Sequence, residues 1–253
     1  MKNIDSLINQ VTCAECLEFM KNIPDKSIDM VLCDLPYGTT ACSWDIVIPF
    51  EPLWEQYKRI IKDRGAIVLN CQQPFTSYLI ISGIDIFRYT WVWNKNYAPN
   101  YMNANKMHTK NFEDISIFYK NQPIYNPQKE QGKPYIDKRK PRGRILSEVY
   151  GTMPYSIGKI CDGLRSPTGI INISGKSNVN IHPTQKPVAL FEYLIKTYTN
   201  EGDLVLDNCA GSGTTAIACM RTNRKYILIE KEQEYIDIIN ARIKKETDQL
   251  KLL

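Results

Sequence analysis

A glycine-rich run between a short apolar segment and a helical pattern constrains the fold of this chain most. The run extends from Asp207 to Thr215 and contains Gly211 and Gly213. Residues 204–206 before it are apolar, as expected of a short buried strand, and the residues after it have apolar side chains at helical spacing. Because glycines let the main chain approach a ligand closely, the run predicts a strand, a ligand-binding loop and a helix.

A second apolar segment follows this predicted helix and ends in an acid. Residues 226–229 are expected to form a strand, and Glu230 follows at the spacing at which an acid bonds ribose hydroxyls. Asp207 at the start of the loop suits a cationic or amino-bearing ligand better than a phosphate. The pattern favours one half of a Rossmann-like sheet that holds a nucleoside. The alternative is a glycine turn that serves only helix and strand packing.

A short acidic and aromatic run lies far away, near the start of the chain. Asp34 follows a predicted strand at residues 27–33, and ligands gather at the carboxyl ends of strands in open α/β sheets. Pro36 biases Leu35 toward an extended conformation, so the Asp34 carboxylate and the Leu35 carbonyl form two neighbouring acceptors that match an exocyclic amino group. Tyr37 adds a face on which a base can stack. Taken alone, the run also fits an ordinary strand-ending turn.

Together these runs resemble the amino-group DNA methyltransferases that depend on S-adenosyl-L-methionine, of the permuted class in which the catalytic tetrapeptide precedes the glycine motif. A third run, Ile181 to Leu190, resembles the segment just upstream of that motif, with Pro187 suited to a first helical position. The resemblance spans about Thr12 to Tyr235 and is weakest between Asn121 and Asn180.

This resemblance implies an α/β fold: a circularly permuted Rossmann-like methyltransferase sheet, mostly parallel with an antiparallel edge. Residues 1–120 would form the catalytic half of the core, residues 121–180 a loop-rich target recognition insert, and residues 181–253 the cofactor-binding half. Residues 50–62 read as a core helix, and residues 88–93 and 114–119 as antiparallel neighbours at the sheet edge.

Site residues carry over from the family by position. The resemblance gives Asp34 and the Leu35 carbonyl the target amino group, makes Tyr37 the stacking face, and places Pro36 with them in the catalytic turn. Where the family more often has Asp-Pro-Phe, this chain has Asp207-Asn208-Cys209, so a thiol replaces an aromatic wall. The cofactor contacts it implies are Glu15, Cys33, Thr184, Lys186, Asp207, Cys209, Ala210, Gly211, Ser212, Gly213, Thr214 and Glu230.

The expected reaction is transfer of a methyl group to N6 of a flipped-out adenine in a specific DNA site. Cytosine N4 is the nearest rival target, but that activity more often accompanies a serine at the position of Asp34. A methyltransferase that acts on RNA or on a protein amide would also tolerate this catalytic turn. A non-catalytic DNA-binding module that kept the fold would belong to a different class of protein. The motif order and a basic insert favour an enzyme that acts on DNA.

Positive charge gathers in one interval of the chain. Between Lys129 and Arg144 seven basic residues face two acids, which equals the whole net charge of +5. Interleaved tyrosines make this a candidate nucleic-acid surface, with a solvated basic loop as the alternative. Residues 94–110 form a second, acid-free and asparagine-rich segment predicted to be a loop near the DNA backbone. The predicted DNA contacts are Lys95, Lys106, Lys133, Lys138, Arg139, Lys140, Arg142 and Arg144.

Neither a metal nor a membrane is expected from the sequence. Cys13 and Cys16 are the one close pair among eight cysteines, with no second pair or nearby histidine to complete a zinc site. The first residues lack the order of a secretion signal, and no apolar run has the length of a membrane span, so a cytoplasmic location is expected. The expected partner is double-stranded DNA; the resemblance adds a homodimer and a cognate restriction endonuclease as candidates.

Overall fold

The structure is a computed structural model that divides into two units. One unit comprises Met1–Asn126 with Gly169–Leu253, and the other comprises Pro127–Thr168. It describes residues 3–39, 42, 45–98, 100–136, 146–147, 151–152, 160–175 and 185–251.

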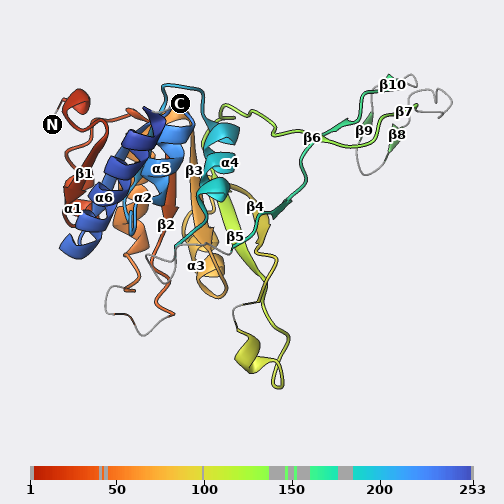
Figure 1. The fold of residues 1–253 in the computed structure, drawn as a ribbon, viewed down its shortest axis with the longest axis horizontal. Coiled ribbons are helices and arrows are strands. Elements are labelled where there is room, and N and C mark those ends of the chain that lie inside the picture. The colour runs from red at the N-terminus through yellow and green to blue at the C-terminus, as the bar shows by residue number, and fades with distance from the viewer. Residues whose placement is uncertain are drawn as a thin grey trace. The chain divides into compact units, whose positions relative to one another are not determined.

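The first unit is built on one mixed sheet of eight strands (Figure 1). Adjacent strands pair in parallel throughout, except that β5 runs opposite to both of its neighbours. This confirms the predicted fold class, an α/β sheet that is mostly parallel. In spatial order the strands are β1 (Gln10–Cys13), β14 (Lys225–Glu230), β13 (Leu204–Asp207), β2 (Ile28–Asp34), β3 (Ile61–Cys71), β5 (Phe112–Phe118), β4 (Phe87–Asn94) and β12 (Ile170–Asn172).

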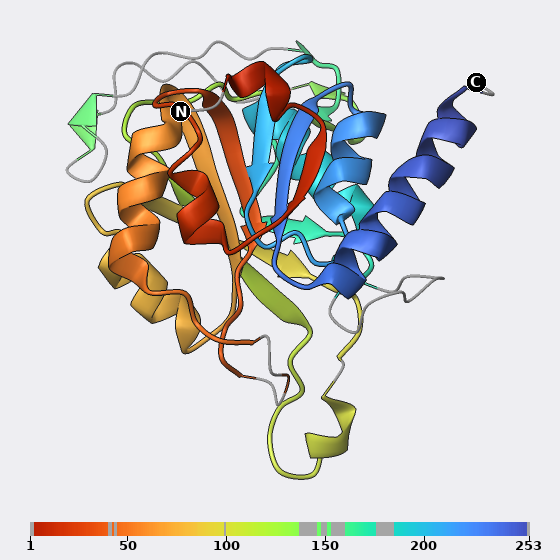
Figure 2. The same ribbon diagram turned by 90° about the vertical axis from the view of Figure 1, so that its left-hand side faces the viewer.

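Helices cover both faces of this sheet, as Figure 2 shows. The helices on one face are α1 (Cys16–Met20), α2 (Phe50–Ile60) and α3 (Phe75–Ser82), and those on the other are α4 (Val188–Tyr198), α5 (Thr214–Arg221) and α6 (Gln233–Leu250). Two short 3-10 helices are η1 (Ile4–Ser6) and η2 (Tyr101–Asn103). Because the central strands are buried on both sides, they read in the sequence as continuous apolar runs rather than as alternating patterns.

The connections change direction between β13 and β2. From β2 the chain crosses through α2 to β3, whereas from β13 it crosses through α5, on the opposite face, to β14. Neighbouring strands whose crossovers lead apart leave a crevice outside their carboxyl ends, where open α/β sheets bind ligands. Asp34 is the last residue of β2 and Asp207 the last residue of β13, so both acids lie at this switch point.

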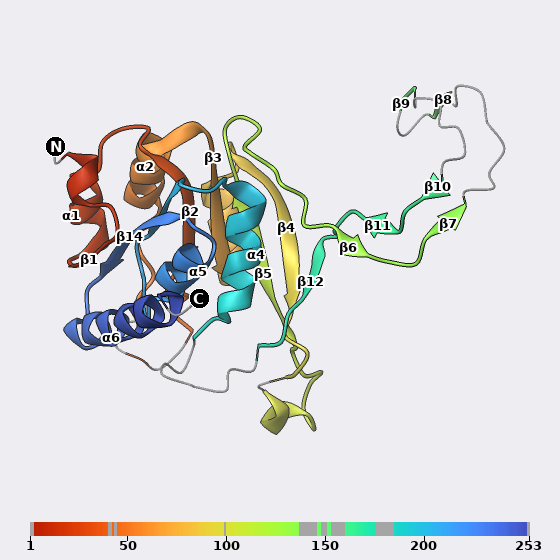
Figure 3. The same cartoon turned by 45° about the horizontal axis from the view of Figure 1, so that its top comes forward.

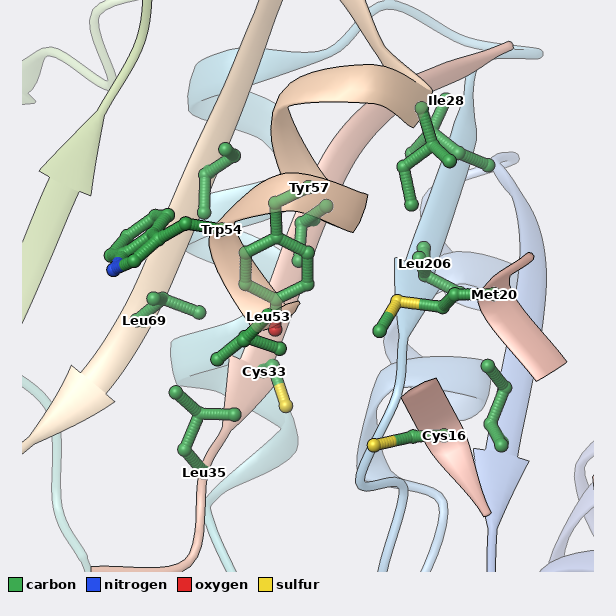
Figure 4. Packing of buried hydrophobic residues seen from close by; sticks show 14 of the residues in the cluster. Cys16, Met20, Ile28, Cys33, Leu35, Leu53, Trp54, Tyr57, Leu69 and Leu206 are labelled. Carbon is green, nitrogen blue, oxygen red and sulfur yellow. The ribbon is translucent and has the colours of Figure 1, made fainter. Parts of the chain in front are cut away.

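The hydrophobic core continues directly beneath the crevice. Figure 4 shows Leu53 and Tyr57 of α2 close to Cys33 and Leu35. Leu35 is buried, so its side chain anchors the turn after β2 in the core. The Leu35 side chain therefore packs in the core, while the backbone of the turn lies at the edge of the sheet.

Three details differ from the sequence-based expectations. The predicted strands at residues 88–93 and 114–119 do pair antiparallel as β4 and β5, but β12 adds to β4 and forms the edge. The antiparallel strand, β5, lies inside the sheet between β3 and β4. Pro187, expected as the first helical residue, caps α4 with an extended backbone one residue earlier.

The second unit contains only short two-stranded pairings among its described residues. They join β6 (Glu130–Gln131) with β11 (Leu164–Arg165), β7 (Tyr135–Ile136) with β10 (Ile160–Cys161), and β8 (Leu146–Ser147) with β9 (Gly151–Thr152). Within the described parts of the chain, no helix is both long and apolar enough to cross a membrane.

Candidate active site

A cavity of about 540 Å³ opens at the switch point of the sheet. The turn after β2, Asp34 to Tyr37, lines it together with residues Asp207 to Ser212 of the glycine-rich loop. Glu230 at the end of β14 and Lys186 just before α4 complete this part of the wall. The structure thus brings the described parts of the three runs singled out in the sequence to one space.

Both carboxylate oxygens of Asp34 are held by neighbouring side chains. The Tyr37 hydroxyl donates to Oδ1 over 2.5 Å, and the Lys186 ammonium donates to Oδ2 over 2.5 Å. Lys186 also lies 3.4 Å from Oε2 of Glu113, which forms an ion pair with Lys95 on its other side. Two acids and two lysines therefore alternate along one wall of the cavity.

The alternation of charges explains how four ionisable groups coexist in a mostly buried place. Burial lowers the pKa of Lys186, but Asp34 and Glu113 outweigh that effect and raise the pKa above its ordinary value. Burial likewise raises the pKa of Glu113, yet the two lysines hold it below the usual range. Lys186 therefore stays protonated and Glu113 stays ionised at neutral pH.

The aromatic ring of Tyr37 is supported from both sides of the turn. It packs against Phe75 with ring centroids 5.2 Å apart, while burial and the Asp34 charge raise the pKa of its hydroxyl. The turn continues into Gly38 and Thr39, whose amides donate to the buried carboxylate of Asp45 over 2.8 and 2.9 Å. This second acid fixes the backbone that presents the ring.

The glycine-rich loop is fixed by side chains from other elements. The Gly211 amide donates to Oε2 of Glu230 over 2.8 Å, and the amides of Lys231 and Glu232 donate to Oε1 over 2.8 and 3.0 Å. Arg242 of α6 donates to the hydroxyl of Ser212 over 3.0 Å and also to its carbonyl. The carboxylate at the end of β14 is thereby held at the loop.

Asp207 occupies the deepest position of the loop. Its carboxylate accepts from the Thr215 hydroxyl and, over 3.1 Å, from the Cys209 amide. Burial raises the pKa of Asp207 to about 7 despite these donors. Beside it, the Tyr57 hydroxyl of α2 donates to Oδ1 of Asn208 over 2.5 Å, which ties the loop to the helix that follows the turn at Asp34 to Tyr37.

The structure places the predicted cofactor residues in two settings. Cys33 is fully buried under the loop, where burial raises the pKa of its thiol to about 12, and Gly213 faces Ile239 of α6 rather than open space. Thr184 lies outside the described residues. The predicted residues that line the cavity are Glu15, Asp34, Leu35, Pro36, Tyr37, Lys186, Asp207, Cys209, Ala210, Gly211, Ser212, Thr214 and Glu230.

The predicted DNA contacts also divide by position. Lys95 lines the cavity and pairs with Glu113, with 14% of its side chain exposed, whereas Lys106 and Lys133 are exposed. The remaining predicted contacts, which lie outside the described residues, are Lys138, Arg139, Lys140, Arg142 and Arg144.

Sequence reasoning missed Glu113, Asp45 and Trp93 as parts of this cavity. The sequence offers one clue to Glu113, an acid next to the apolar pattern that predicts β5. In the structure Glu113 is buried at the start of this strand. No sequence signal pointed to Asp45, because its partners are backbone amides seven and six residues away.

Comparison with known proteins agrees with the fold. The family model of DNA methylases matches residues 28–241. The type II methyltransferase M.HpaI of Haemophilus parainfluenzae is 29% identical over 94% of this chain and 74% of its own length. M1.MboII of Moraxella bovis, also a type II methyltransferase, is 26% identical over 92% of this chain and 95% of its own length.

Solved structures show the same fold. The crystal structure of an M1.HpyAVI–SAM complex matches with a TM-score of 0.63 at 24% identity, over 92% of this chain and 98% of that one. The PvuII DNA methyltransferase, described as cytosine-N4-specific, matches with a TM-score of 0.65 at 19% identity, over 94% and 90% of the two chains.

The sheet and its cavity thus define an α/β methyltransferase. Since the family model covers most of the sequence, the chain belongs to the DNA methylase family and is a DNA methyltransferase.

Proposed function

We propose that this enzyme transfers the methyl group of S-adenosyl-L-methionine to N6 of an adenine turned out of double-stranded DNA. The observation that carries the proposal is the shared cavity, which the turn Asp34 to Tyr37 and the loop Asp207 to Ser212 line together. Direct transfer requires donor and acceptor in one enclosed space. A base stacked in a duplex cannot present its amino group there, so the proposal includes base flipping.

The residues of the loop side fit S-adenosyl-L-methionine. The cavity volume of about 540 Å³ falls in the range of ligand sites, about 300–1,000 Å³. A methyl group at Gly211, whose φ is +51°, would meet nothing within 4 Å, so this backbone borders open space. Six acids line the cavity against three lysines, an excess that suits a cationic ligand. When bound, the cofactor supplies an electrophilic methyl group on a positively charged sulfur.

Individual contacts follow from this fit. Glu230, fixed by three amides, keeps acceptor capacity for ribose hydroxyls, since an ionised carboxylate accepts about four hydrogen bonds. Asp207, whose pKa of about 7 leaves it partly ionised at neutral pH, is proposed to face the cationic end of the ligand. Glu15, Lys186 and Cys209 line the same space and are proposed contacts on that ground.

The turn side is proposed to bind the target base. Asp34 has two donors in the free enzyme and keeps acceptor sites for an amino group. With the Leu35 carbonyl it would orient the amino group, and Tyr37 would stack on the ring. An amino nitrogen conjugated to its ring is a poor nucleophile, so positioning its lone pair toward the methyl group supplies most of the rate.

Adenine is preferred over cytosine because of the residue at position 34. Cytosine-N4 enzymes of this architecture more often carry serine where this chain has Asp34. The fold itself does not distinguish adenine from cytosine as the target, because the cytosine-N4-specific PvuII enzyme and the M1.HpyAVI complex match this chain with similar TM-scores.

DNA contacts outside the cavity are proposed for two basic segments. Lys106 is exposed between β4 and β5, and Lys133 is exposed in the unit Pro127–Thr168. We propose residues 121–180 as the target recognition insert, between core halves at residues 1–120 and 181–253, because this interval carries the excess positive charge. A homodimer, a cognate restriction endonuclease and a cytoplasmic location belong to the same proposal.

The test is nucleoside analysis of DNA from cells that express the wild type, Asp34→Ala, or the exposed control Asp85→Ala. We expect N6-methyladenine with the wild type and the control and none with Asp34→Ala, which should still bind S-adenosyl-L-methionine in calorimetry within about threefold. N4-methylcytosine would overturn the choice of adenine. DNA without any methylated base would overturn the proposed function.

A further inference from the structure

An arm formed by residues 95–111 leaves the sheet at the edge where the cavity opens. It joins the end of β4 to the start of β5, and β4 runs in the same direction as β3, so β4 ends at the same edge as β2. Trp93, Lys95 and Tyr97, at the root of the arm, line the cavity. Figures 2 and 3 show the arm and its short helix η2, in yellow-green, extending beyond the sheet.

The arm exposes large apolar side chains at its far end. Tyr101 is 72% exposed, Met102 83% and Met107 60%. Single exposed apolar residues are ordinary, but three within seven residues on a projecting segment indicate a surface that another molecule covers.

The charge of the arm indicates what that molecule is. From residue 95 to residue 111 the sequence contains no acid, whereas Lys106, His108 and Lys110 flank the apolar end and five asparagines supply amide groups. Apolar side chains among cations and amides match a nucleic acid, whose phosphates lie outside its stacked bases. A wholly apolar partner surface would leave these polar groups without partners.

The arm is held in shape by its own hydrogen bonds. The Lys110 amide donates to Oδ1 of Asn100 over 2.8 Å, and the Met107 amide donates to the Asn103 carbonyl over 3.0 Å. At the root, the Lys95 amide donates to the Asn111 carbonyl over 2.8 Å. The apolar end is therefore presented on a preformed support, which lowers the ordering cost of binding.

We infer that Tyr101 and Met102 enter the DNA duplex beside the target base and occupy the stack that the base leaves. The inference rests on the proposed function, since it concerns how the base reaches the cavity. Side chains that stack on the exposed neighbouring bases compensate for the lost base stacking and keep the flipped base from returning. The arm begins at the cavity wall, so a duplex that delivers a base to the cavity passes the root of the arm.

The test compares Tyr101→Ser/Met102→Ser with Tyr78→Ser/Ile81→Ser, a control that removes an exposed tyrosine and an exposed aliphatic residue (61% and 70%) from α3. Each enzyme is assayed on two duplexes. In one the recognition site is fully paired, and in the other the target adenine of the same site lies unpaired opposite an abasic position. On the paired duplex, we expect kcat/KM of the arm variant to fall about 10- to 100-fold, and that of the control to stay within about threefold.

On the unpaired target the defect of the arm variant should shrink to within about threefold, because flipping then costs less. Fluorescence of 2-aminopurine at the target position should rise less with the arm variant than with the wild type. If the wild type methylates DNA but the arm variant loses kcat/KM equally on both duplexes, or loses none on the paired duplex, the inference is overturned. A wild type that methylates neither duplex refutes the proposed function and this inference with it.

Discussion

Gly213 offers a quantitative test of how the glycine-rich loop is built. Its φ of +77° is a left-handed conformation that L side chains rarely adopt, and it caps the start of α5. A methyl group at this position would lie 2.9 Å from both Cγ1 and Cγ2 of the fully buried Ile239. The structure therefore predicts that Gly213→Ala destabilises the fold through α6.

The magnitude follows from two separable costs. A left-handed backbone costs a residue with a side chain about 1–2 kcal/mol, and forcing a methyl group into a packed core costs about 1–3 kcal/mol. We expect Gly213→Ala to lower the free energy of unfolding by about 2–5 kcal/mol. Gly202 is the matched control, because its φ is +83° but a methyl group there meets nothing within 4 Å. Gly202→Ala should lose only about 1–2 kcal/mol.

Urea unfolding measures both losses, and a double-mutant cycle identifies the cause. Ile239→Ala removes the two atoms that the new methyl group would meet, so the double variant should recover about 1–3 kcal/mol relative to additive effects. The entropy that alanine removes from the unfolded chain is common to both glycine positions and cancels in the comparison. Equal losses for Gly213→Ala and Gly202→Ala, or additive effects in the cycle, would refute the packing role of Gly213.

Three further substitutions test the charges and the support of the cavity. Asp207 has a pKa of about 7 in the folded protein, above its unfolded value, so the native state binds a proton that the unfolded state has released. The free energy of unfolding should therefore fall as pH rises from about 4 to 7. In urea unfolding across this range, Asp207→Asn should show a smaller dependence of stability on pH. Glu113→Gln removes the carboxylate that pairs with Lys95 and one of the two that pair with Lys186. The free energy of unfolding should fall by about 3–5 kcal/mol, as for a broken buried ion pair, and an unchanged urea midpoint would contradict the pairing. Arg242→Met removes the side chain that donates a hydrogen bond to Ser212, so calorimetry should show about tenfold weaker binding of S-adenosyl-L-methionine. Substitution of an exposed lysine on the same helix is the control and should leave this binding unchanged.

Much of the fold follows from the sequence because the central strands are short, apolar and bounded by clear turns. The strand before Asp34 and the strand before Asp207 are both predictable on this ground, and their acids lie at the predicted edge. β12 could not be predicted in the same way. It has three residues, with only Ile171 buried, and depends on pairing with β4 about 78 positions earlier in the chain.

The direction of β5 explains why Glu113, alone among the four charged residues of the wall, was not predicted. The sequence predicts that the strands at residues 88–93 and 114–119 pair antiparallel, but it does not indicate which of the two runs against the parallel strands. The sequence therefore leaves open at which edge of the sheet Glu113 lies. Because β5 runs in the reverse direction, its first residues pair with the carboxyl end of β3 and lie at the same edge of the sheet as the carboxyl end of β2. The same reversal brings the connection from β4 to β5 to the cavity, so one antiparallel strand delivers both the partner of Lys186 and the arm at residues 95–111. Local sequence specifies each group, but the direction of a single strand decides that they act at one site.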